Sequence, residues 1–428
     1  MKNRKFWIAL VIFSLVGQIA WVMENMYFNV FIYKMFHAGP EAISNMVMAS
    51  AIAATVTTLL IGALSDKVGK RKLFICGGYI LWGISILSFS LIRMDVISRF
   101  VPAAQAASVG ISLVIVMDCV MTFFGSSAND AAFNAWLTDS TDATNRGKVE
   151  GINAMMPLVA ILVVFGGFMS FDQNLPETWT VIFGVIGSVV LVLGIAGFFL
   201  IEEKPIATED NQNYIKNIFY GFRPSVIRSN PKLYLALLAY GVFGIAINIF
   251  MPYLILYYSV SLGMDNYVLI FAPAIILAAV FTALYGRVYD KKGFKAAVLP
   301  ALGLLMAGFV VLYFCETTVP VFIGSLLMMC GYLSGMAVFG AVLRDHTPEN
   351  KAGMFQGQRI VGQVLIPGII GPAIGAAVLQ NAKTILNDDG TTSFIPNENI
   401  FLAAFVAACV IFLALWPLFR KMREDRRG

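Results

Sequence analysis

Twelve long apolar runs constrain the fold of this 428-residue chain more than any other feature. Each run has about 20 residues or more, the length that an α-helix needs to cross the hydrocarbon core of a bilayer. Since a spanning segment must satisfy its own backbone hydrogen bonds, such runs are expected to be helices. The predicted spans are 6–33, 42–64, 73–93, 105–137, 149–170, 178–201, 232–260, 266–288, 296–314, 319–343, 354–379 and 399–419.

The composition excludes a soluble globular protein. Hydrophobic residues make up 59% of the chain and charged residues 13%, which leaves too few polar side chains to cover a surface in water. The five cysteines are scattered and predict neither a disulfide framework nor a thiolate metal site. His37 and His346 lie in different loops, so we expect no metal site and no cofactor other than a coupling ion. No convincing cleavage site precedes Glu24, so the basic start and first apolar run are interpreted as an uncleaved first helix.

The net charge of +5 is interpreted as a signal of topology, because the 30 Lys and Arg residues gather on no single face or helix that would suit nucleic acid. With the N-terminus placed in the cytoplasm, the loops on the other side hold only Lys34, Arg93, Arg99 and Lys383, and Arg359 is assigned to a span. This bias follows the positive-inside rule. Since the number of spans is even, both termini are predicted to be cytoplasmic, and we expect a prokaryotic cytoplasmic (inner) membrane.

The two halves of the chain repeat each other. GALSDKVGKRK at 62–72 matches GRVYDKKGFKA at 286–296 with a constant offset. LTDSTDATNRGKVEGIN at 137–153 matches LRDHTPENKAGMFQGQR at 343–359 without a gap, so that Asp139 corresponds to Asp345. Matches in the same order indicate a duplicated six-helix unit.

The longest polar connection separates the sixth span from the seventh. We therefore predict an N-terminal six-helix bundle over 1–201, a cytoplasmic linker over 202–231 and a C-terminal six-helix bundle over 232–428. Duplicated bundles suit alternating access, in which two bundles rock about a site at their interface.

The loop at 62–72 also carries a motif. Gly62 and Gly69 permit close helix contact and a tight turn, and Asp66 stands at a helix end beside basic residues. The pattern is similar to the signature loop of the major facilitator superfamily, and the resemblance covers the whole chain through its twelve spans and duplicated halves. It implies an all-α membrane protein with twelve transmembrane helices in two pseudo-symmetric six-helix bundles, the major facilitator fold.

In that family the aspartate and basic residues of the loop form a cytoplasmic charge relay that stabilises the outward-facing state. The resemblance therefore implies roles in conformational gating for Gly62, Asp66, Gly69, Arg71 and, as the weaker counterpart in the second half, Asp290. The alternative is that the basic residues only enforce topology.

The fourth span carries a line of polar and small residues. At 3.6 residues per turn, one face presents Asp118, Thr122, Gly125 and Asn129, with Asp130 and Asn134 beside it. The phrase NDAAFNAW followed by LTDSTDATNRG resembles the fourth helix of the glycoside-pentoside-hexuronide:cation symporters, the melibiose permease group. In that group an aspartate at the position of Asp130 binds the sugar.

One departure from this group concerns the cation site. Its members carry acidic residues in the second span, whereas ISNMVMASAIAATVTTLLIGAL has none before Asp66. The cation site of the group is therefore not transferable, and either a different acid performs coupling or the mechanism differs.

The first span contains a polar wedge. Gln18, Trp21, Asn25 and Asn29 form one narrow stripe at 100° per residue, with Glu24 on its edge. An ionisable group at this depth is costly in hydrocarbon, so the wedge is expected to face a cavity. Three acids within spans against Arg359 alone imply that one acid is protonated or neutralised by a cation. Glu24 is the first choice for cation coupling, followed by Asp118 and Asp130; structural roles for these acids are the alternative.

Three polar residues of the second half complete the predicted site. Arg359 and Gln363 share a face of the eleventh span, and Asn248 repeats Asn25 where NIFMPYLILYY at 248–258 matches NMYFNVFIY. Substrate binding is predicted for Gln18, Trp21, Asn25, Asn29, Asn129, Asp130, Asn134, Asn248, Arg359 and Gln363. For Arg359 the alternative is that its side chain extends to the cytoplasmic interface.

These features favour a cation-coupled importer of a neutral polar solute, a sugar, glycoside or oligosaccharide, with protons preferred over sodium. The alternative is efflux of an amphiphilic drug-like or lipid-like molecule by the same fold, which the 20 Met and 34 Phe keep open. A membrane receptor or an enzyme would need a sizeable soluble domain or a nucleophile with its base, and the sequence supplies neither. The expected partners are the lipid bilayer and a small-molecule solute, without nucleic acid, and the chain is expected to work as a monomer.

Overall fold

The computed structural model describes residues 4–141, 146–202, 219–264, 266–348, 355–387 and 390–424. Within these ranges the chain is almost entirely helical, and twelve helical segments are long and apolar enough to cross a membrane. Every predicted span overlaps one of them, so the predicted all-helical membrane fold is confirmed. The chain divides into two compact units, Met1–Tyr214 and Ile215–Gly428.

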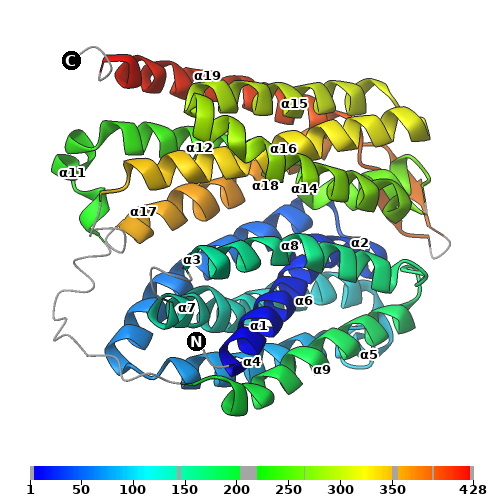
Figure 1. Cartoon of the computed structure of the whole chain (residues 1–428). Helices are drawn as coiled ribbons and strands as arrows, with labels where there is room; N and C mark the ends of the chain where they lie inside the picture. The colour runs from blue at the N-terminus through cyan, green and yellow to red at the C-terminus, as the bar shows by residue number, and fades with distance from the viewer. Residues whose placement is uncertain are drawn as a thin grey trace. The chain divides into compact units, whose positions relative to one another are not determined.

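The N-terminal unit holds six of the candidate membrane spans. Its helix α4 packs along α9, α1 along α8 and α3 along α6 (Figure 1). The elements are α1 (Arg4–Val22), η1 (Met23–Tyr27), α2 (Phe28–Phe36), α3 (Pro40–Val68), α4 (Arg71–Ser88), η2 (Phe89–Leu91), α5 (Met94–Ile97), α6 (Ala103–Gly125), η3 (Ser126–Phe133), α7 (Asn134–Ser140), α8 (Arg146–Phe168) and α9 (Pro176–Leu200).

The C-terminal unit holds the other six candidate spans. Here α15 packs along α16, α14 along α16, and α12 along both α18 and α19. The elements are η4 (Tyr220–Phe222), α11 (Pro224–Ser229), α12 (Pro231–Phe250), η5 (Met251–Tyr253), α13 (Leu254–Leu256), η6 (Tyr257–Ser261), α14 (Tyr267–Lys292), α15 (Phe294–Phe314), α16 (Thr318–His346), α17 (Gln356–Ile360), η8 (Val361–Leu365), α18 (Ile366–Leu379), β1 (Thr384–Leu386), β2 (Thr392–Phe394) and α19 (Asn399–Glu424).

The antiparallel hairpin of β1 and β2 was not predicted. Its strands have three residues each and pair Thr384 with Phe394 and Leu386 with Thr392. Gly390 adopts a φ of 81° in the connection, a conformation that glycine reaches without a steric penalty. Strands this short carry too few alternating residues to be distinguished from a loop in the sequence.

Prolines and glycines set several helix ends. Pro40 and Pro176 begin α3 and α9, where a missing N–H costs no intrahelical bond. Gly69 ends α3 with a φ of 69°, and its N–H donates to the carbonyl oxygen of Ser65 at 3.0 Å. The chain therefore turns sharply at Gly69 between α3 and α4, within the loop predicted at 62–72.

Four π-helical segments interrupt the described helices: η1, η3, η6 and η8. Such segments are rare and often occur at functional sites. Three of them hold residues that the sequence singled out: η1 contains Glu24, η3 contains Asp130 and η8 contains Gln363. A π turn also changes the rotation per residue, so a stripe drawn at 100° per residue is not kept through η1.

Candidate functional site

Glu24 lies at the centre of a buried polar cluster in the N-terminal unit. Only 8% of this residue is exposed. Its Oε1 accepts a hydrogen bond from Ser50 Oγ of α3 at 2.5 Å and another from Thr122 Oγ1 of α6 at 2.9 Å. The two hydroxyl oxygens are 2.8 Å apart. The second carboxyl oxygen, Oε2, is buried without a hydrogen-bond partner among the described residues.

Asp118 adds a second buried acid to this cluster. It lies one helical turn before Thr122, is 2% exposed, and interacts electrostatically with Glu24. Its Oδ1 also has no hydrogen-bond partner among the described residues. Within the described part of the chain no basic side chain pairs with either acid. Two neighbouring carboxylates cannot remain ionised and dry without a compensating charge, so the cluster requires a proton or a cation.

The π-helical segment η3 positions the remaining acid of the fourth span. Asp130 is half-buried, and its Oδ2 accepts a hydrogen bond from Ser126 Oγ at 3.1 Å. It interacts electrostatically with Glu24, so all three predicted coupling acids belong to one region of this unit. Asn134 is exposed and donates from Nδ2 to the carbonyl oxygen of Asp130 at 3.1 Å.

Asn129 is buried against the first helix. A Cβ atom at Gly17 of α1 would lie 2.5 Å from its Nδ2, so a larger residue at position 17 would displace this amide. Asn129 is 5% exposed. The side chain is therefore part of the contact between α1 and η3.

The polar stripe of the first span divides at η1. Trp21 packs its ring against Trp82 with centroids 5.1 Å apart, and Gln18 is half-buried. Asn25 is exposed and donates from Nδ2 to the carbonyl oxygen of Trp21 at 2.8 Å. Asn29 is buried and donates in the same way to Asn25 at 2.9 Å. Both amides thus donate hydrogen bonds to backbone carbonyl groups of their own irregular helix. The Glu24 carboxylate, in contrast, is hydrogen-bonded to side chains of α3 and α6.

The C-terminal unit carries a second polar group, formed by α12, α17 and η8. Glycines let these elements approach closely: a Cβ atom at Gly241 would lie 3.0 Å from the carbonyl oxygen of Gly362. Arg359 and Gln363 are half-buried here, and neither the Arg359 Nε nor the Gln363 Nε2 has a hydrogen-bond partner among the described residues. Asn248 is half-buried on α12, where its Nδ2 donates to the carbonyl oxygen of Gly244 at 2.9 Å.

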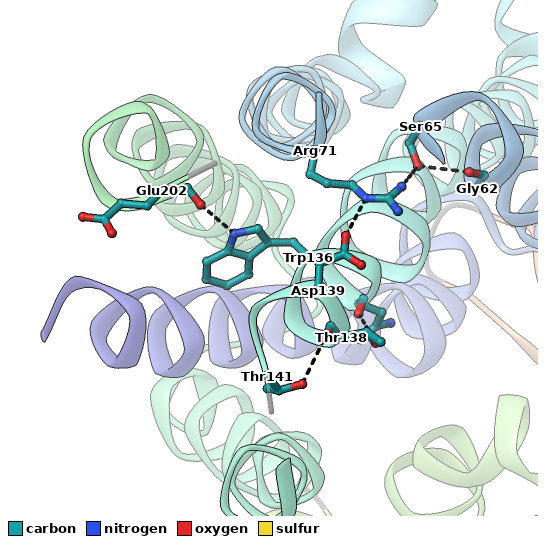
Figure 2. A network of polar contacts seen from close by, with 9 residues as sticks. Gly62, Ser65, Arg71, Trp136, Thr138, Asp139, Thr141 and Glu202 are labelled. Atoms are coloured by element: carbon teal, nitrogen blue, oxygen red, sulfur yellow. Dashed lines mark hydrogen bonds and ion pairs between the residues drawn. The ribbon is translucent and has the colours of Figure 1, made fainter. Parts of the chain in front are cut away.

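The predicted gating loop is held by Arg71. Figure 2 shows its guanidinium between Ser65 and Asp139. Nε donates to Asp139 Oδ2 at 3.1 Å and Nη1 donates to Ser65 Oγ at 2.7 Å, while Ser65 Oγ donates to the carbonyl oxygen of Gly62 at 3.1 Å. Arg71 is buried and joins the end of α3 to the end of α7. The side chain of Asp66 lies outside the described residues, so its predicted role stays a prediction.

The C-terminal unit makes the corresponding connection with different residues. Tyr289 stands at the position equivalent to Ser65, and its hydroxyl donates directly to Asp345, the counterpart of Asp139. Lys295, the counterpart of Arg71, instead lies over the ring of Phe419 at 5.6 Å. Asp290, the predicted counterpart of Asp66, is exposed. The repeat therefore preserves the contact between two helices but not the arginine that makes it in the first half.

Replacing Arg71 by glutamine is expected to slow solute uptake by about tenfold, because a buried charge-assisted hydrogen bond is lost. Asp139→Asn is expected to have a similar effect, and the double variant is expected to be no slower than either single variant because both act through one contact. The measurement is the initial rate of uptake in proteoliposomes. Lys70→Gln, at a neighbouring exposed residue, is the control. An equal loss in Lys70→Gln would show that the basic residues act only through their charge.

One cavity of about 290 Å³ lies apart from all the predicted site residues. It is found in the N-terminal unit among the ends of α2, η2, α5 and α9, where Phe31, Phe89 and Trp179 line it. Arg93 lies at the cavity and donates to Asp95 at 2.9 Å. The Arg93 guanidinium holds the pKa of the Asp95 carboxyl below its ordinary value. Since this arginine already pairs with acids, the cavity offers no unused charge.

Sequence reasoning missed the partners of the predicted acids. Ser50 lies in a span without acidic residues, and nothing in its neighbourhood distinguishes it from Ser44 or Thr58. Thr122 was on the predicted line of the fourth span, but its bond to Glu24 crosses from one helix to another.

Among the described residues no group of three His, Cys, Asp or Glu side chains is placed to hold a metal ion.

The family model described as Major Facilitator Superfamily matches residues 6–372. The multidrug resistance protein 2 of Bacillus subtilis (strain 168) is 22% identical over 361 residues, covering 81% of this chain and 82% of that protein.

Two solved transporter structures resemble the whole chain. The nucleoside transporter NupG has a TM-score of 0.67 at 14% identity and covers 98% of this chain and 99% of its own. A D-xylose-proton symporter has a TM-score of 0.71 at 13% identity, with 96% and 97% covered. At these identities the likeness concerns the fold.

Proposed function

Since this chain belongs to the major facilitator superfamily of membrane transporters, we propose that it carries a sugar, glycoside or oligosaccharide into the cell together with protons, by alternating access. The transport function and the integral membrane location follow from the family and the twelve apolar helices. The solute, the coupling ion, the direction and the place in the melibiose permease-like group belong to this proposal.

The observation that carries proton coupling is the buried pair of Glu24 and Asp118. Both acids have an oxygen without a partner, and no described basic residue compensates them. A single proton shared within the cluster would supply the missing donor and remove one negative charge. If the cluster becomes accessible to water on alternate sides, it can take up a proton on one side and release it on the other.

The choice of a hydroxylated solute is supported by the side chains around these acids. Amides such as Asn25 and carboxylates such as Asp130 offer both donors and acceptors, which suits hydroxyl groups. Trp21, which is half-buried against the buried ring of Trp82, offers aromatic surface for the apolar face of a sugar ring. The D-xylose-proton symporter, similar in fold, is named for a sugar and a proton.

Efflux of an amphiphilic or drug-like molecule is the second candidate. It is favoured by the similarity to a protein named for multidrug resistance. The 20 methionines and 34 phenylalanines of the chain would also suit an apolar solute.

Uptake by the purified protein in proteoliposomes tests the proposal. The solutes are labelled pentoses, hexoses, disaccharides and nucleosides, and the driving force is an imposed pH gradient, acidic outside. We expect accumulation of a sugar that a protonophore stops. Accumulation driven by a sodium gradient alone would contradict proton coupling. Extrusion of fluorescent amphiphiles, without a response to any sugar, would favour the second candidate.

A further inference from the structure

Two hydrogen-bond donors remain unused on one polar face of the C-terminal unit. Arg359 stands near the end of α17, and Gln363 follows one turn later in η8. The Arg359 Nε and the Gln363 Nε2 are both buried, and neither has an acceptor among the described residues. Since buried donors without acceptors are costly, this face is suited to a ligand that brings acceptor oxygens.

The charge of this face is also uncompensated. Within the described residues, the groups that interact electrostatically with Arg359 are Tyr240 and Arg344. Tyr240 is neutral at physiological pH, and Arg344 repels the Arg359 guanidinium. Asp345, beside Arg344 in the chain, accepts instead from Tyr289. The C-terminal unit therefore contributes a positive charge inside a predicted span without a described acid to neutralise it.

The placement of Arg359 argues against a side chain that merely reaches the membrane surface. An arginine that extends to water keeps its guanidinium donors hydrated, whereas Arg359 is half-buried and its Nε is out of contact with solvent. The surrounding helices are also closely packed. Tyr240 stacks on Phe339 with ring centroids 5.4 Å apart and an interplanar angle of 7°. A Cβ atom at Gly362 would lie 2.8 Å from Leu237 of α12. The donors thus project from closely packed helices.

We propose that Arg359 and Gln363 bind an oxyanion group, a carboxylate or phosphate, carried by the transported solute. The planar guanidinium matches such a group in geometry and charge, and the Gln363 amide adds a neutral donor one turn away. This inference rests on the proposed transport function and refines it, because the expected neutral sugar becomes an acidic one. The acids of the N-terminal unit then serve coupling and the arginine of the C-terminal unit serves recognition.

Binding to matched pairs of solutes tests the proposal. The full-length protein is placed in phosphatidylcholine nanodiscs, and affinities are measured by calorimetry for a phenyl glucoside and the phenyl glucuronide, and for a nucleoside and its 5′-monophosphate. The wild type is expected to bind the acidic member of at least one pair about tenfold more tightly, as a charge-assisted contact implies. The first pair probes a carboxylate and the second a phosphate.

Variants locate the contact. Arg359→Gln is expected to remove the preference for the acidic member while keeping the affinity for the neutral one. Arg359→Lys, which keeps the charge but loses the planar fork, is expected to retain only part of the preference. Arg287→Gln, at an exposed arginine of the same unit, is the matched control and is expected to behave as wild type.

Three outcomes overturn the inference. The first is that the wild type shows no preference for the acidic member in either pair, and the second is that the preference survives Arg359→Gln. The third is an Arg359-dependent retention of anionic lipid in native mass spectra without binding of either acidic solute. Failure of this inference can also be distinguished from failure of the proposed function. Proton-driven uptake of a neutral sugar that Arg359→Gln leaves unchanged would reject this inference alone. Arg359-dependent binding of an acidic solute that is never transported would reject only the proposed function.

Discussion

Replacing Glu24 by glutamine is expected to abolish proton-driven accumulation, so that the solute concentration inside proteoliposomes no longer exceeds that outside. Glutamine has nearly the same shape, and its side-chain oxygen can still accept from Ser50 and Thr122. It cannot exchange a proton. We therefore expect the fold, and exchange of labelled for unlabelled solute at equal concentrations, to persist while the response to the pH gradient disappears.

The control for Glu24→Gln is Glu41→Gln. Glu41 is exposed in the first turn of α3, away from the buried cluster, and its replacement is expected to leave accumulation unchanged. Accumulation by Glu24→Gln at the wild-type level would show that Glu24 has only a structural role. If Asp118→Asn abolished accumulation in that case, Asp118 would take over the assignment as the coupling acid.

Replacing Gly331 by alanine is expected to destabilise the protein strongly. Gly331 lies on α16 where it meets α15, and an added Cβ atom would lie 2.2 Å from the backbone N of Leu305 and 2.5 Å from its Cα. Because backbone atoms cannot move aside as a side-chain end can, the two helices must separate. Overpacking of this kind typically costs about 1–3 kcal/mol, and more where a backbone has to shift.

Gly340→Ala on the same helix provides the matched control with the opposite sign. A Cβ atom there has no neighbour within 4 Å, so alanine is expected to stabilise the helix by about 0.5–1 kcal/mol through its higher helix propensity. Thermal unfolding of both purified variants in detergent gives the comparison. Equal midpoints for the two variants would contradict the close packing of α15 against α16.

The membrane fold could be predicted because its signal is local. A run such as 178–201 is predominantly apolar and carries no charge, and a helix satisfies the backbone hydrogen bonds of so long a run within lipid. The repeat of 62–72 at 286–296 likewise required only a comparison of the chain with itself. The β1–β2 hairpin was missed because its three-residue strands carry no comparable local pattern.

The polar site was predictable only as a set of residue types. The chemistry of Glu24, Asp118 and Arg359 stands out because ionisable groups in spans are costly. From the sequence, however, the direction of each side chain could be estimated only by assuming a regular α-helix. The π-helical segments η1, η3 and η8 change the rotation per residue, and so the direction of the side chains that follow. Within η1, Asn25 of the predicted stripe is exposed, whereas Glu24 on the edge of that stripe is buried.

The sequence by itself determined that the chain is a duplicated bundle of membrane helices with acids and an arginine inside its spans, because hydrophobic length and charge placement are properties of the linear chain. Only the tertiary structure decided that Ser50 and Thr122 serve Glu24, that Arg71 joins Ser65 to Asp139, and that Arg359 and Gln363 keep unused donors. Each of these depends on which faces of separate helices meet. That choice is made by side-chain packing, including the glycine contacts that let helices approach, and no single segment contains it.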